Sequence, residues 1–156
     1  VDGTLTDGGI YRGNNSEDIK KFNVKDGYTI VNAQKVGIEF GIITGKVSQL
    51  VKNRAEELKI KYLYQNVADK VIILNEIMQK EKLSAEEIAY IGDDYNDLRI
   101  MKNVGLSGAP KDAAEEVLKI ADFISTQNGG EGAVRDFVEF IMKKDGKLEK
   151  FFDNIK

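Results

Sequence analysis

The sequence predicts an α/β protein, with a Rossmann-like three-layer α/β/α arrangement around a mostly parallel sheet. Short apolar runs, which we expect to be buried strands, alternate with segments whose apolar residues recur every three or four positions, as in amphipathic helices. A polar, acidic turn at residues 92–97 directly follows the apolar run 88–91. Open α/β sheets bind their ligands at this kind of position, beyond the end of a strand.

The first element breaks this alternation. After a turn-rich stretch at residues 1–9, residues 10–24 are expected to form a β-hairpin flap with a polar turn at 13–16. Asp26 is a candidate cap for the helix that follows, and Gly37 is expected to end that helix.

The remaining elements follow the α/β pattern. Strands are expected at residues 38–43, 62–64, 88–91, 106–107 and 123–125. Helices are expected after residues 44–46, from Asp69, after the acidic turn as far as Gly105, over 112–120, and after the glycine-rich loop 127–132. Residues 84–87 have the form of a capping box. No insertion of domain size interrupts the pattern, so we expect one domain over 1–143 without a cap domain, and a charged tail over 144–156.

The composition excludes several classes of function. The 156 residues carry a net charge of -3 with dispersed basic residues, which argues against a nucleic-acid partner. No apolar run approaches the length of a membrane span. Because the sequence contains neither Cys nor His, it has no thiol nucleophile, no Ser-His-Asp triad and no histidine-ligated or cysteine-ligated metal site.

The acidic turn is a candidate metal site. Asp93, Asp94 and Asp97 stand close together in it, with Asn96 between them. Carboxylates packed this closely repel one another unless a cation lies among them, and Mg²⁺ is a common hard cation at such oxygen ligands. The alternative is a solvated turn in which Asp or Asn caps the next helix.

Other polar residues stand at strand ends elsewhere in the chain. Asp2 lies near the start, Thr44 ends one predicted strand, and Lys70 opens a helix after another. Right-handed parallel connections place such strand ends, and the acidic turn, on one edge of the sheet. A hydroxyl, an amine and carboxylates at one edge suit a phosphoryl group bridged to the protein by Mg²⁺.

These motifs, V-D-G-T-L-T-D at 1–7, I-I-T-G at 42–45, a lysine, and I-G-D-D-Y-N-D at 91–97, resemble the haloacid dehalogenase superfamily of phosphatases in type and order. The resemblance covers nearly the whole chain. It is strongest to the capless branch that contains 3-deoxy-D-manno-octulosonate 8-phosphate (KDO 8-phosphate) phosphatases, through N-V-K-D-G-Y at 23–28, L-Y-Q at 63–65 and G-G-E-G-A-V-R at 129–135.

The resemblance assigns catalytic roles. Asp2 matches the second aspartate of the family's D-x-D motif, the general acid/base. Thr44 would hydrogen-bond the phosphoryl oxygens, and Lys70 would hold nucleophile and phosphate together. The nucleophile, which forms an aspartyl-phosphate intermediate, is expected immediately before Val1, on a central strand upstream of this sequence.

The resemblance also implies a magnesium site and a substrate. Asp93 would ligate Mg²⁺ directly and Asp94 and Asp97 would act from around it, so the implied metal set is Asp2, Asp93, Asp94 and Asp97. The implied substrate-binding residues are Asn23, Val24, Lys25, Asp26, Gly27, Lys46, Arg54 and Lys70.

The implied reaction is hydrolysis of KDO 8-phosphate to KDO and phosphate, as in lipopolysaccharide biosynthesis. Lys46 and Val31 stand where the branch often has Arg, and Lys cannot form Arg's bidentate fork to a carboxylate. The nine-carbon 3-deoxy-nonulosonate 9-phosphate therefore stays open as an alternative substrate.

The branch further implies a cytoplasmic homotetramer in which a neighbouring subunit replaces the cap, with assembly around the hairpin at 10–24. Two other classes stay open. A phospho-receiver domain also combines acidic residues, Thr and Lys, although its acidic pair comes early in the chain. A non-catalytic oligomerisation module is the other.

Overall fold

A computed structural model describes residues 1–14 and 18–156 of the chain. The strands are β1 (Tyr11–Arg12), β2 (Asp18–Ile19), β3 (Gly41–Ile43), β4 (Tyr62–Tyr64), β5 (Ala89–Ile91), β6 (Leu106–Ala109) and β7 (Phe123–Ile124). The α-helices are α1 (Val24–Gln34), α2 (Gln49–Glu57), α3 (Lys70–Glu81), α4 (Leu98–Met101), α5 (Glu115–Ile120), α6 (Ala133–Lys144) and α7 (Leu148–Asp153). The short 3-10 helices η1 (Ala85–Glu87) and η2 (Tyr95–Asp97) flank β5.

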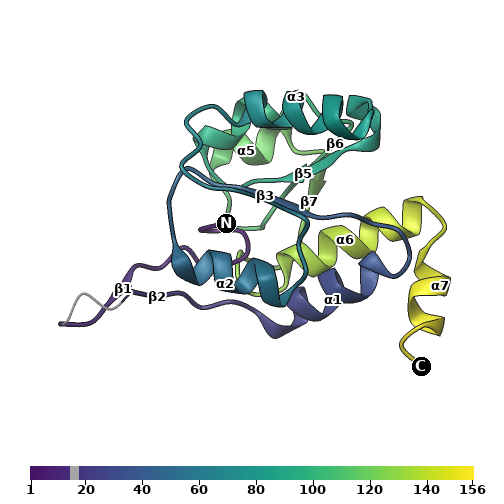
Figure 1. Ribbon diagram of the computed structural model, residues 1–156, viewed down its shortest axis with the longest axis horizontal. Coiled ribbons are helices and arrows are strands. Elements are labelled where there is room, and N and C mark those ends of the chain that lie inside the picture. Colours follow the sequence, from purple (N-terminus) through teal and green to yellow (C-terminus); the bar gives the residue numbers. More distant parts are fainter. Residues whose placement is uncertain (15–17) are drawn as a thin grey trace.

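Helices cover both faces of the parallel strands, which confirms the predicted three layers. α3 and α5 lie on one side, and α1, α2 and α6 lie on the other (Figure 1). β3 pairs in parallel with β4, and β5, β6 and β7 pair in parallel in that order. Among the described residues no ladder joins β3 to β5, so these strands form two parallel sheets rather than the single sheet expected.

The predicted hairpin is present and extends away from the body of the molecule (Figure 1). β1 and β2 pair antiparallel, with Tyr11 opposite Ile19. An antiparallel bridge between Thr6 and Phe22 continues the pairing at the base of the hairpin. Part of the turn expected at 13–16 falls on residues 15–17, which lie outside the described residues.

The predicted cap of the first helix was wrong. α1 is capped by Asn23, whose backbone is extended and whose side chain accepts from the Lys25 N–H. Asp26 is 1% exposed and faces another helix. The helix expected from Asp69 is α3, with Asp69 as its N-cap, and the predicted capping box is confirmed, formed by Ser84 and Glu87.

The strand expected from residue 38 is shorter than predicted. Its ladder covers only Gly41–Ile43, because its partner β4 is itself three residues long. Ile38 and Phe40 instead pack against the main hydrophobic cluster, so their apolar character reflects burial outside the ladder.

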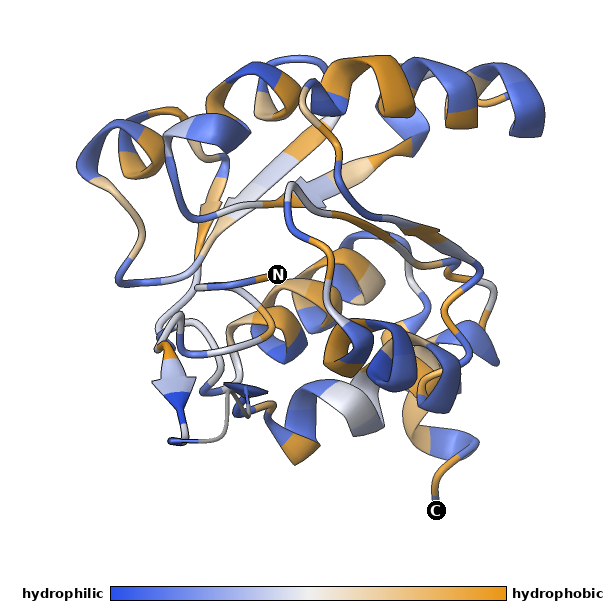
Figure 2. Cartoon of the chain, turned by 60° about the vertical axis from the view of Figure 1, so that its left-hand side comes forward, coloured by the Kyte–Doolittle hydropathy of each residue, from blue (hydrophilic) through white to orange (hydrophobic). Residues whose placement is uncertain are grey.

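The main core lies between α1, α6 and α7. It contains Ile30, Ala33, Val36, Leu58, Val134, Val138, Met142 and Phe151. Apolar residues run along the strands and the helices packed on them (Figure 2). The stretch expected as a charged tail contains a helix, α7. The Phe151 side chain is 3% exposed and anchors this helix in the core of its own chain.

None of the described helices is long and apolar enough to cross a membrane. Even α3 and α6 contain only 12 residues each, which is shorter than a hydrocarbon core requires.

Candidate active site

Three of the predicted site residues follow a strand or begin a helix, and a fourth lies in the N-terminal turn. Thr44 directly follows β3, Lys70 begins α3 after β4, and Asp93 lies two residues beyond β5. Thr44 is buried, and its backbone N–H donates to the Tyr64 carbonyl, which ties the ends of β3 and β4 together. Asp2 approaches the same region in the N-terminal turn, because the adjacent Gly3 abuts the Asp93 side chain.

Asp97 organises the acidic turn from inside it. Its Oδ2 accepts hydrogen bonds from the backbone N–H groups of Asp93 at 3.1 Å and Asp94 at 3.4 Å. A Cβ at Gly92 would lie 2.5 Å from the Asp97 Cβ, so the turn closes tightly only with glycine there. Asp94 caps η2 by accepting from the Tyr95 N–H. Two of the three carboxylates thus shape the turn itself.

Lys70 and Asp97 form a buried ion pair with a tyrosine. The Lys70 Nζ lies 2.5 Å from Asp97 Oδ1 and 3.2 Å from the Tyr90 hydroxyl, which itself donates to Asp97 Oδ1 at 2.6 Å. Burial works to raise the pKa of the Asp97 carboxyl, but the Lys70 charge and the hydrogen bonds from Lys70 and Tyr90 outweigh it and lower that pKa. Burial and the Asp97 charge raise the pKa of Tyr90 well above its usual value, which keeps its hydroxyl a donor.

Neither Asp93 nor Asp94 forms an ion pair with a lysine or arginine among the described residues, and Asp93 is the more buried of the two. Its Oδ1 accepts a 2.8 Å hydrogen bond from the Thr4 hydroxyl. Burial raises its pKa, the Thr4 hydrogen bond opposes this, and the charges of Asp97 and Asp94 add to the rise. A divalent cation beside Asp93 would offset this accumulated negative charge, so the residues fit Mg²⁺ at this position.

The structure does not gather the four predicted metal ligands into one cluster. Within residues 1–14 and 18–156, no three acidic side chains converge as a metal site. The Asp97 Oδ1 faces Lys70, and the Asp2 carboxylate faces lysines. Direct ligation by Asp93, with Asp94 and Asp97 acting through the shape of the turn, stays a prediction.

Asp2 lies between two lysines from different parts of the chain. Its Oδ1 is 2.5 Å from the Lys20 Nζ, at the base of the hairpin, and its Oδ2 is 3.9 Å from the Lys46 Nζ, after β3. Lys46 was a predicted substrate residue and does lie beside Asp2. Lys20 was not predicted, because a lysine in a hairpin usually indicates only a solvated surface.

The predicted substrate stretch at 23–27 divides into an exposed and a buried part. Val24 and Lys25 are exposed, whereas Asp26 and Gly27 are buried. The Asp26 Oδ1 accepts from the Arg135 N–H at the start of α6, and the desolvation that accompanies burial raises the pKa of Asp26. Asn23 donates to the Gly130 carbonyl. These residues join α1 to α6, and their role in binding substrate stays a prediction.

Arg54, another predicted substrate residue, packs against the start of α1. Its guanidinium donates to the Asn23 carbonyl at 3.4 Å and pairs with Glu57 at 2.8 Å. A Cβ at Gly27 would overlap the guanidinium, so glycine makes this approach possible. Arg54 is thus held by contacts within its own chain, and its role in binding substrate stays a prediction.

The glycine-rich loop before α6 supports the N-terminal turn. The Gly130 N–H donates to the Thr4 carbonyl at 2.9 Å, and a Cβ at Gly129 would overlap the Gly3 carbonyl. A Cβ at Gly130 would overlap backbone atoms of Thr6 and Asp7. The loop therefore fixes the turn that carries Asp2, a role for which the sequence offered only the signal of successive glycines.

Comparisons with known proteins identify the family of the chain. A family model for haloacid dehalogenase-like hydrolases matches residues 62–138, which include Lys70 and the acidic turn. The 3-deoxy-D-manno-octulosonate 8-phosphate phosphatase KdsC of Escherichia coli (strain K12) is 43% identical over 96% of this chain and 80% of its own. The chain belongs to the family of haloacid dehalogenase-like hydrolases.

Solved structures point to a particular branch of that family. The Yersinia pestis 3-deoxy-D-manno-octulosonate 8-phosphate phosphatase superposes with a TM-score of 0.92 at 42% identity, covering 96% of this chain and 80% of that one. The Moraxella catarrhalis phosphatase of the same name, in complex with magnesium ion, phosphate ion and KDO, superposes with a TM-score of 0.96 at 34% identity. The match covers 100% of this chain and 90% of that one.

Proposed function

We propose that this protein is a Mg²⁺-dependent phosphatase that hydrolyses 3-deoxy-D-manno-octulosonate 8-phosphate to the sugar acid and phosphate. The observation that carries the proposal is the acidic turn, where Lys70 pairs with Asp97 and the N-terminal turn lies against Asp93, in a chain similar along almost its full length to phosphatases named for this substrate. Its retained site supports an enzyme rather than an oligomerisation module.

The residues of the chain suit phosphoryl transfer to an aspartate, which we place immediately before Val1. Asp2 would give a proton to the sugar oxygen as the P–O bond breaks, and would later take a proton from the water that hydrolyses the acyl phosphate. Thr44 would donate to a phosphoryl oxygen, and Lys70, held by Asp97, would supply fixed positive charge. Mg²⁺ bound at Asp93 would neutralise charge on the phosphoryl group.

A substrate comparison tests the choice of sugar acid, in a chain extended to the aspartate placed before Val1. Lys46 is 70% exposed beside Asp2 and lacks the fork of an Arg, which favours keeping the nine-carbon 3-deoxy-nonulosonate 9-phosphate as the second candidate. We expect a higher kcat/KM for the eight-carbon substrate. A higher value for the nine-carbon substrate would reassign the protein to that substrate.

We further propose a homotetramer assembled around the hairpin at 10–24, and a cytoplasmic location. Ile10, Ile19 and Val24 are 75%, 60% and 79% exposed, an unusual set of apolar side chains for a free surface. Light scattering on the purified protein tests the assembly, with Ile10→Ser and Ile19→Ser combined as the disrupting variant. A monomeric unsubstituted protein at micromolar concentration would contradict it, and cell fractionation tests the location.

A further inference from the structure

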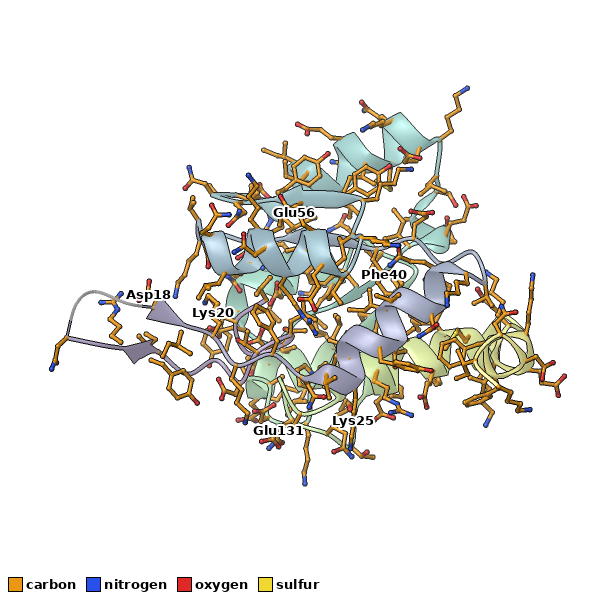
Figure 3. The ribbon with its side chains drawn as sticks, turned by 60° about the horizontal axis from the view of Figure 1, so that its bottom comes forward. Asp18, Lys20, Lys25, Phe40, Glu56 and Glu131 are labelled. Carbon is orange, nitrogen blue, oxygen red and sulfur yellow. The ribbon has the colours of Figure 1, made fainter. Side chains whose placement is uncertain are left out.

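Lys20 reaches from the hairpin to the candidate general acid/base. Figure 3 shows Lys20 where the hairpin joins the body and Asp18 further out along it. The Lys20 Nζ lies 2.5 Å from the Asp2 Oδ1, and its side chain is 18% exposed, against 28% for Asp2. A partly buried lysine from the hairpin therefore contacts the Asp2 carboxylate directly.

The register of the hairpin aims Lys20 at this position. Side chains alternate between faces along an extended chain, so Lys20 and Phe22 share one face and Lys21 takes the other. Phe22 is fixed by its bridge to Thr6 and by packing against the cluster of Ile42, Val51 and Ala55. The Lys21 Nζ instead lies 3.8 Å from the Asp7 Oδ2, and the Lys21 side chain is 57% exposed.

The second lysine near Asp2 is placed differently. Lys46 is 70% exposed and its Nζ is 3.9 Å from the Asp2 Oδ2, so water and salt screen that pair. The Lys20 pair is shorter and much less exposed, and it therefore constrains the carboxylate more strongly. With Oδ1 held by Lys20, Oδ2 is the oxygen left to face a substrate.

We propose that Lys20 is a positioning residue for proton transfer by Asp2. The inference rests on the proposed phosphatase function and adds a residue to it. Lys20 fixes the rotation of the Asp2 carboxylate, so that Oδ2 presents its proton to the leaving-group oxygen. Without Lys20, the carboxylate turns toward the exposed ammonium of Lys46, and proton donation becomes misaligned.

The test compares two kinds of leaving group in the extended chain. A sugar or simple alkyl phosphate needs a proton on its leaving oxygen, whereas p-nitrophenyl phosphate releases a stable phenolate without one. We expect Lys20→Met to lower kcat for the alkyl esters by about 10-fold or more and for the aryl ester by less than about 3-fold. Lys20→Arg should recover most of the loss, because it restores a cation to Asp2.

Lys21→Met is the matched control, since it removes the neighbouring lysine from the other face of the hairpin, and both substrates should be cleaved as by the unsubstituted protein. Equal losses on both substrates in Lys20→Met, or no loss on either, would overturn the inference. If the unsubstituted protein cleaves simple alkyl phosphates but not 3-deoxy sugar-acid phosphates, the proposed substrate is wrong. The alkyl-to-aryl ratio still decides the role of Lys20 in that case.

Discussion

Replacing Gly130 by alanine should damage both stability and activity, because this residue lies against the turn that carries Asp2. Gly130 has φ of +67°, a backbone conformation that costs a residue with a Cβ about 1–2 kcal/mol. The new Cβ would also overlap the backbone of Thr6 and Asp7, and such overpacking costs about 1–3 kcal/mol. The two contributions predict a total loss of about 2–5 kcal/mol in the free energy of unfolding.

Gly146→Ala separates the two contributions. Gly146 has the same φ of +67°, but nothing lies within 4 Å of the position that its new methyl group would take, so only the backbone cost applies. Urea unfolding of the two variants should therefore differ by about 1–3 kcal/mol, with Gly130→Ala the less stable. Equal losses would refute the reasoning, because they would mean that the N-terminal turn moves aside freely. The activity of Gly130→Ala should also fall, whereas that of Gly146→Ala should not.

Three further predictions concern buried groups. Lys70→Met should cost about 3–5 kcal/mol in urea unfolding, because it leaves the Asp97 carboxylate buried without its cation, and adding Asp97→Asn should recover part of the loss. Phe151→Ala should lower the free energy of unfolding by about 3–5 kcal/mol, because it leaves a cavity where α7 packs on the core. Phe152→Ala, at a side chain that is 37% exposed, should cost far less, and similar losses would mean that α7 does not pack on the core. Burial raises the pKa of Asp26 above 3.8, so ionisation of Asp26 opposes folding as pH rises from 3.8 through that raised pKa. The stability of Asp26→Asn relative to the unsubstituted protein should therefore rise as pH increases above 3.8, and a flat difference would contradict this.

The alternation of strands and helices could be predicted because it depends on local periodicity. The capping box at Ser84 was predicted for the same reason, since the residues that form it are neighbours in the chain. The ends of parallel strands converge by a general rule of topology, which is why Thr44, Lys70 and Asp93 could be predicted as one site, and the structure places each of them just after a strand or at the start of a helix.

Contacts between distant segments could not be predicted in this way. Asp26 is a residue type that often caps helices, but its carboxylate accepts a hydrogen bond from the N–H of Arg135, 109 positions away. Thr4 donates to Asp93 across 89 positions. Nothing local distinguishes Lys20 from Lys21; the bridge of the hairpin to the N-terminal turn decides which of the two faces Asp2.

The most direct test of the proposed function measures phosphate release from KDO 8-phosphate by the chain extended to the aspartate placed before Val1. We predict release that requires Mg²⁺, stops on chelation, and is abolished by Asp93→Asn, while the exposed Asp153→Asn leaves it unchanged. Turnover that persists without divalent metal, or that survives in Asp93→Asn, would contradict the assignment of Asp93 and the metal-dependent mechanism built on it.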